Sequence, residues 1–161
     1  MCNNPHVLSY LQEVETLFAD INKWVSDTGL KLRREEITIN EEQSGQYTAS
    51  RLIIEDASGK KVAELSPVAA FVIAADGRLD LNGTVDKAII VYLQQGGPSF
   101  TTSVHHGNQT DTKKTYLYKG IDKNGWYMID DSRRAKAHFV DKELFFELLS
   151  EVSDYEQSKA A

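Results

Sequence analysis

Two adjacent histidines, His105 and His106, are the side chains of this sequence that come nearest to a catalytic pattern. Ser103 precedes them and Asp111 follows a few residues later. A histidine can remove the proton of a serine hydroxyl while a carboxylate orients the ring, and this combination produces a serine nucleophile. The pattern supports one function hypothesis, a small hydrolase or ligand-binding domain that uses the loop 96–114.

Two properties of the same loop argue against this chemistry. The spacing G-x-S-x-G, which exposes a nucleophile at a sharp turn, does not occur around Ser103. Neighbouring residues of an extended strand point to opposite faces, so His105 and His106 would not reach the same centre. The simpler interpretation is a solvent-exposed polar loop, although a connection of this length is uncommon in a compact domain.

Motifs for a metal ion or a cofactor are absent from the sequence. Zinc sites need three or four ligands at short spacings, such as H-E-x-x-H or paired cysteines. The chain has one cysteine, Cys2, and its four histidines do not form such a pattern. The segment 122–125 lacks the later ligands of a calcium loop and is typical of a hairpin turn. We therefore expect no metal and no cofactor.

An aromatic and basic group indicates a different kind of site. Tyr118 and Trp126 are expected on neighbouring strands, and Arg133 and Arg134 follow closely. Tryptophan, tyrosine and arginine are the side chains most enriched at the energetic centres of protein interfaces. Aromatic residues also pack well across strands, so core packing stays open as an explanation. If the chain binds another protein, we expect these four residues to contact it.

Composition and charge narrow the classes of function. The chain has 161 residues, of which 41% are hydrophobic and 26% charged, and these values exclude wholesale disorder. Its net charge is −6, so nucleic-acid binding is not expected and a basic partner is favoured. The longest apolar run, Val68–Ala75, is too short for a membrane span of roughly 20 residues. A single cysteine and the lack of a signal peptide favour the cytoplasm.

The periodicity of the apolar residues predicts an α+β fold. Apolar positions at steps of three and four predict a helix over 5–27. Short β-rich runs between turn signals predict a curved antiparallel sheet over 30–139, a meander of about 6–8 strands. A second helix is predicted over 141–153, followed by a frayed tail, 154–161. We expect these elements to form a single domain, 1–161.

Two of the predicted strands, Val68–Ala74 and Ala88–Leu93, are apolar at consecutive positions. Strands of this kind are usually covered on both faces, whereas two helices on one side leave the other face of a sheet bare. The second cover could be a curl of the sheet, the loop 96–114, or a second copy of the chain in a homodimer.

The leading function hypothesis combines this surplus of apolar strand surface with the acidity and the lack of an assembled catalytic motif. It is a non-enzymatic protein-binding module, such as a chaperone, an adaptor or an immunity protein.

Overall fold

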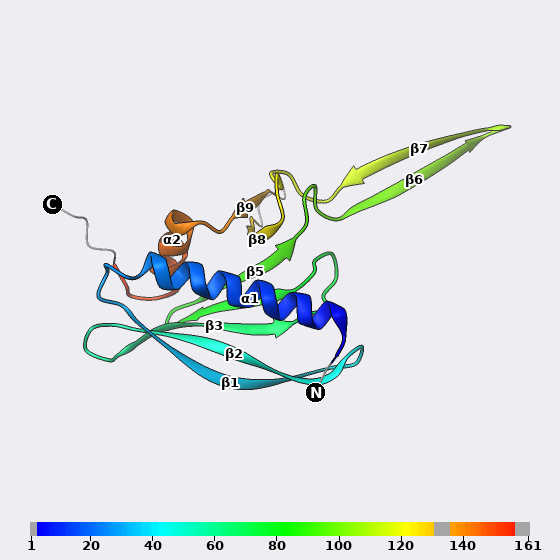
Figure 1. Cartoon of the computed structure of the whole chain (residues 1–161). Coiled ribbons are helices and arrows are strands. Elements are labelled where there is room, and N and C mark those ends of the chain that lie inside the picture. Colours follow the sequence, from blue (N-terminus) through cyan, green and yellow to red (C-terminus); the bar gives the residue numbers. More distant parts are fainter. Residues whose placement is uncertain (1–2, 131–135, 157–161) are drawn as a thin grey trace.

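The computed structural model describes residues 3–130 and 136–156, in which two helices flank an antiparallel sheet (Figure 1). Along the chain the elements are α1 (Pro5–Trp24), β1 (Lys31–Glu41), β2 (Gly45–Glu55), β3 (Lys61–Ala69), β4 (Arg78–Gly83), β5 (Lys87–Leu93), β6 (Ser99–His106), β7 (Gln109–Tyr116), β8 (Gly125–Ile129), β9 (Ala137–Phe139) and α2 (Lys142–Val152). The predicted α+β class, with one helix at each end of the chain, is confirmed.

Seven of the described strands form one sheet in the order β1-β2-β3-β4-β5-β8-β9, and β6 and β7 form a separate two-stranded sheet. All neighbouring strands run antiparallel. The first five strands are a simple meander, as predicted. The interpretation of 122–125 as a turn between paired strands that carry Tyr118 and Trp126 is wrong, because Tyr116 ends β7 while β8 pairs with β5 and β9.

Local side-chain chemistry explains the bounds of α1. The side-chain oxygen of Asn4 accepts hydrogen bonds from two backbone N–H groups of the first turn, at 2.9 and 3.3 Å. The helix ends at Trp24, three residues before the predicted end at 27. Just after this end, the Ser26 hydroxyl donates a hydrogen bond to the carbonyl of Lys23 at 2.8 Å. The buried face of α1 consists of Val7, Tyr10, Val14, Leu17, Phe18 and Ile21.

The second helix, α2, begins after its capping residue, Asp141. The carboxylate of Asp141 accepts a hydrogen bond from the backbone N–H of Leu144 at 2.8 Å. Its buried side chains are Phe145, Phe146, Leu148, Leu149 and Val152. This helix contacts β4 and β5, and it closes the same core as α1.

The two faces of the large sheet differ in chemistry. The buried residues on the helix side include Leu52, Ile54, Leu65, Leu79, Leu81, Ile90 and Trp126. On the other face of β1–β4, Arg51 pairs with Glu35 at 3.1 Å and with Glu64 at 2.9 Å. Arg78 pairs with Asp80 through two hydrogen bonds of 2.8 and 3.1 Å. This alternation is the pattern of an antiparallel sheet that covers its core on one side.

One core residue, Tyr10, makes the stability of the fold decrease at alkaline pH. Tyr10 is 2% exposed, and its hydroxyl donates to the carbonyl of Arg78 at 2.7 Å. Burial, together with the nearby Tyr47, raises the pKa of the Tyr10 hydroxyl. The unfolded chain releases this proton near pH 10, at about the ordinary tyrosine pKa, whereas the folded chain retains it. The stability that the folded protein gains from the protonated Tyr10 hydroxyl is therefore fully present below about pH 10 and is lost as pH rises further.

We expect Tyr10→Phe to reduce this alkaline sensitivity. Between about pH 10 and 11, the free energy of unfolding of the unchanged chain should fall more steeply, by up to about 1.4 kcal/mol per pH unit. Urea unfolding of both chains at several pH values measures the two slopes. Parallel slopes would show that Tyr10 does not hold its proton in the folded state.

The predicted strand over Val68–Ala74 is wrong. β3 ends at Ala69, and its register against β4 shifts between Pro67 and Ala69. Proline lacks the N–H that continues a ladder, and a bulge of this kind redirects the strand. Residues 70–77, which we name the apolar loop, lie between β3 and β4 and belong to neither strand, and Ile73 is 99% exposed. This segment therefore does not argue for a cover on two faces.

The predicted double cover of Ala88–Leu93 is present in part. Ile90 is buried on the helix side, and Leu93 is buried in a second, smaller cluster that includes Ile121. Since Ile121 belongs to the segment after β7, the chain itself supplies part of this second cover. Ile89 is still 43% exposed.

The loop predicted over 96–114 is largely a β-hairpin. β6 and β7 pair along their whole length, from Ser99 opposite Tyr116 to His106 opposite Gln109. A two-residue turn closes the hairpin, and Gly107 adopts a φ of 61° there. The segment expected to be a polar loop therefore contains two paired strands. Figure 1 shows that the hairpin projects from the rest of the molecule.

Candidate interaction site

Trp126, predicted as the centre of a partner-contact patch, lies in the core instead. It is 5% exposed, and its indole N–H donates to the carbonyl of Glu13 at 3.0 Å. Its ring contacts the rings of Tyr10 and Tyr92 edge to face, at centroid distances of 6.3 and 5.3 Å. Because both the ring and the N–H are satisfied inside the molecule, Trp126 cannot be a surface contact in this structure.

The other members of the predicted patch do not join Trp126 on one surface. Tyr118 is half-buried against the smaller cluster around Leu93 and Ile121. Arg133 and Arg134 lie outside the described residues. The predicted grouping therefore has no support from the described part of the chain.

The four residues of the hydrolase hypothesis lie on the β6–β7 hairpin. His105 approaches the Thr110 hydroxyl at 3.0 Å through its Nδ1. The register places Ser103 and His105 on one face, whereas Asp111 lies opposite Val104 on the other face. All eight residues of β6 are exposed. The arrangement thus does not bring serine, histidine and aspartate together in a sheltered site.

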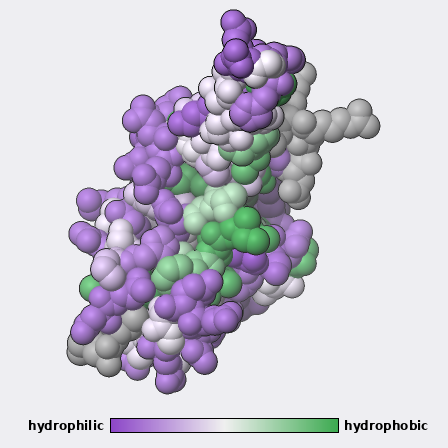
Figure 2. Space-filling model, turned by 90° about the vertical axis from the view of Figure 1, so that its right-hand side faces the viewer, coloured by the Kyte–Doolittle hydropathy of each residue, from purple (hydrophilic) through white to green (hydrophobic). Residues whose placement is uncertain are grey.

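The apolar loop forms a hydrophobic patch at one end of the molecule. Figure 2 faces this end and shows a green hydrophobic area framed by mostly hydrophilic surface. Ile73 is the most exposed large hydrophobic residue described, and Phe71 and Val72 are half-buried beside it. With His6 and Gln43, these three residues line a shallow depression of about 480 Å³. An exposed apolar patch with a polar rim is typical of an interaction site.

Glu41, at the end of β1, fixes the start of the apolar loop. Its carboxylate accepts hydrogen bonds from the backbone N–H groups of Ala70 at 2.9 Å and Phe71 at 3.0 Å. The Tyr47 hydroxyl donates to the same carboxylate. His6 adds a contact of 2.6 Å between its Nε2 and the carbonyl of Ala70. Hydrogen bonds to a carboxylate are charge-assisted and are stronger than neutral ones. The start of the loop is therefore held by two elements of the body, β1 through Glu41 and α1 through His6.

The far side of the apolar loop is also constrained. Ala74 adopts a φ of 65°, a left-handed conformation that a residue with a Cβ seldom takes. The following Asp76 accepts a hydrogen bond from the side-chain amide of Gln94 at 2.8 Å. Gly77 lies so close to Tyr10 that a Cβ there would meet the ring at 2.2 Å. The loop therefore presents Ile73 in a defined conformation.

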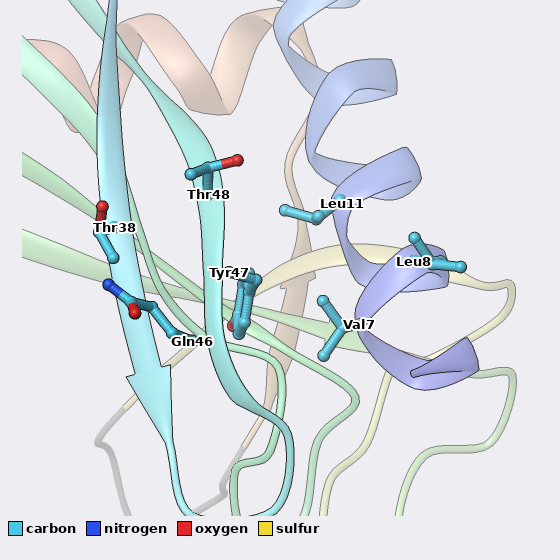
Figure 3. Close-up of a pocket in the computed structure, with 7 residues that line it drawn as sticks. All are labelled: Val7, Leu8, Leu11, Thr38, Gln46, Tyr47 and Thr48. Carbon is cyan, nitrogen blue, oxygen red and sulfur yellow. The ribbon is translucent and has the colours of Figure 1, made fainter. Parts of the chain in front are cut away.

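A groove of about 330 Å³ runs between α1 and β1–β2 at the same end of the molecule. Figure 3 shows Val7 and Leu11 of α1 facing Tyr47 and Thr48 across it. Leu8, at its rim, is 51% exposed. Tyr47 connects the two features, because the carboxylate that it contacts also holds the apolar loop.

The comparisons with known proteins find no relative: no family model, no curated protein and no solved structure matches this chain. Within residues 3–130 and 136–156, no three histidine, cysteine or acidic side chains are grouped so that they could hold a metal ion. Over the same residues, neither helix is long and apolar enough to cross a membrane. The site is therefore interpreted from its own geometry.

Sequence reasoning missed the residues that build this site. Ile73 belongs to an apolar run that is typical of a buried strand, and Glu41 lies in an acidic stretch that is typical of a turn. The one available signal was Pro67, which disfavours a continuous central strand at this position.

Proposed function

We propose that this protein is a non-enzymatic protein-binding module that contacts its partner through the apolar loop. The observation that carries the proposal is the position of Ile73, which is 99% exposed on a loop whose backbone is hydrogen-bonded to the side chains of Glu41 and His6. A mobile loop would expose apolar side chains intermittently. A fixed loop that exposes isoleucine continuously has a cost in solubility, which a binding role explains.

The defined conformation of the loop favours tight binding. Association is opposed by the entropy lost when side chains and loops become ordered, and a loop that is already ordered avoids much of that loss. Full burial of an isoleucine side chain contributes about 1.5–3 kcal/mol. Ile73 can therefore act as an anchor that enters a pocket of the partner, as interface anchors commonly do.

Charge supports a basic partner. The chain carries a net charge of −6, and Asp76 lies within the apolar loop itself. An acidic surface attracts a basic partner and raises the rate of association, and this effect weakens as salt screens the charges. The partner that fits is a protein with an apolar pocket for Ile73 and basic side chains around it.

We expect Ile73→Asp to abolish most of the binding while the fold is retained. The lost burial corresponds to about a ten- to one-hundredfold weaker complex. Val85→Asp is the matched control, because Val85 is 72% exposed on the β4–β5 turn, away from the apolar loop. Calorimetry with the purified partner measures the affinity of each variant.

Cross-linking from the same two positions, 73 and 85, can identify the partner. A photo-reactive residue placed at 73 should cross-link the partner, whereas the same group at 85 should not. The cross-linked protein is then identified by mass spectrometry and purified for calorimetry. A purified partner that binds Ile73→Asp as tightly as the unchanged chain would show that the apolar loop is not the contact.

A further inference from the structure

The β6–β7 hairpin, residues 99–116, is an arm that lies outside the core. At its base the backbone N–H of Leu117 donates to the carbonyl of Pro98 at 3.0 Å, and this bond holds the two strands of the arm together where they leave the body. In the part of the chain that the structure describes, β6 and β7 pair with no other strand. An isolated two-stranded hairpin is marginally stable in water, and stability rises when further strands are added. The arm therefore gains most from a partner that extends its sheet.

The two outer edges of the arm differ in charge. β6 contains no lysine, arginine, aspartate or glutamate, whereas β7 carries Asp111, Lys113 and Lys114. Asp111 and Lys113 lie on the same face, since they are two residues apart on one strand. Lys114 lies on the other face, with its amino group 5.3 Å from the centre of the Tyr116 ring.

We propose that the arm pairs with the arm of a second copy of this chain, β7 against β7, antiparallel, with Thr112 on the two-fold axis. In this register Asp111 lies opposite Lys113 of the second copy, and Lys113 lies opposite Asp111 of the second copy. Opposite charges directly across an antiparallel pair stabilise it. The same two residues thus form two ion pairs, as a two-fold interface requires.

The charges also exclude the neighbouring registers. With Lys113 on the axis, two lysines would lie directly opposite each other, and with Asp111 on the axis, two aspartates would do so. Like charges in this position are destabilising. The uncharged β6 offers no comparable selection, because a polar strand without charges specifies its register weakly. β7 is therefore the edge that encodes one arrangement.

The pairing keeps the acidic bodies apart. The arm carries two lysines and one aspartate, a net charge of +1, so the rest of the chain carries −7. Thr112 lies five residues from the base of the arm, which is roughly 17 Å of extended strand. The bases of two antiparallel arms are then roughly 34 Å apart, several times the screening length of about 8 Å at physiological salt. The dimer forms without bringing the two acidic bodies together.

The test is sedimentation equilibrium of the full-length chain and of charge-exchanged variants. Lys113→Asp and Asp111→Lys each place like charges opposite one another twice, and each should weaken the dimer by about tenfold or more. The double variant Asp111→Lys with Lys113→Asp restores both ion pairs and should recover the original dissociation constant to within about threefold. All of these side chains are exposed, so circular dichroism should show an unchanged fold.

Lys114→Asp is the matched control. It changes the charge of β7 as Lys113→Asp does, but Lys114 lies opposite Thr110 in the proposed register, so the dimer should persist. A monomeric unchanged chain would overturn the proposal. A dimer that survives Lys113→Asp would overturn it as well. So would a dimer that is broken by Val104→Lys on β6 but not by the changes on β7.

Discussion

Replacing Trp126 by alanine should lower the free energy of unfolding by about 3–5 kcal/mol. The indole is 5% exposed and lies between the rings of Tyr10 and Tyr92. Its removal leaves a cavity and also leaves the carbonyl of Glu13 without the indole donor. Urea unfolding followed by far-ultraviolet circular dichroism measures the loss, because this signal does not depend on the tryptophan itself.

Two further variants separate packing from surface effects. Trp126→Phe retains a ring but loses the hydrogen bond to Glu13, so its loss should be clearly smaller. Ile73→Ala shortens an apolar side chain that is 99% exposed, and it should change stability by no more than about 0.5 kcal/mol. If Trp126→Ala unfolds like the unchanged chain, the indole is not part of the core.

Trp126 illustrates a limit of sequence reasoning for this fold. The alternation along β8 predicts that Trp126 and Met128 share one face, and the register supports this. It does not say which face the helices cover. That choice depends on α1, which lies more than one hundred residues earlier in the chain. The carbonyl of Glu13 in α1 accepts the hydrogen bond from the indole N–H. An interface-type residue at the surface and a core residue have the same local pattern.

The features that can be predicted from the sequence of this chain are local ones. Asn4 and Asp141 cap their helices through contacts within a few residues, and the apolar periodicity of both helices needs no distant partner. Arg78 and Asp80 are two residues apart on one strand, so the strand period alone places them on one face, where they pair. These elements were sufficient for the fold class.

The candidate site depends on distant contacts, and it was missed. His6 and Ala70 are 64 residues apart, and Glu41 reaches Ala70 and Phe71 across 29 and 30 residues. None of these pairs has a spacing that marks it in the sequence. Without them, an apolar run such as 68–75 is most simply interpreted as a buried strand, because nothing local indicates that it leaves the sheet.

Glu41→Gln should loosen the apolar loop with little change in shape. The carboxylate offers one oxygen to the N–H of Ala70 and the other to the N–H of Phe71. A glutamine has one oxygen and one NH₂ group, so one of the two backbone donors must face another donor. Leaving a buried donor unsatisfied costs about 1–3 kcal/mol. Hydrogen exchange should therefore accelerate at Ala70 and Phe71 by about tenfold or more, measured by nuclear magnetic resonance.

Glu42→Gln is the matched control, because it makes the same chemical change one residue later, at a side chain outside these hydrogen bonds. Exchange at Ala70 and Phe71 should then stay as in the unchanged chain. If the fixed conformation of the loop is what favours binding, Glu41→Gln should also weaken the complex with the partner, although Ile73 is intact. Faster exchange with undiminished affinity would mean that Ile73 contributes through its exposure alone and that the anchoring by Glu41 serves stability.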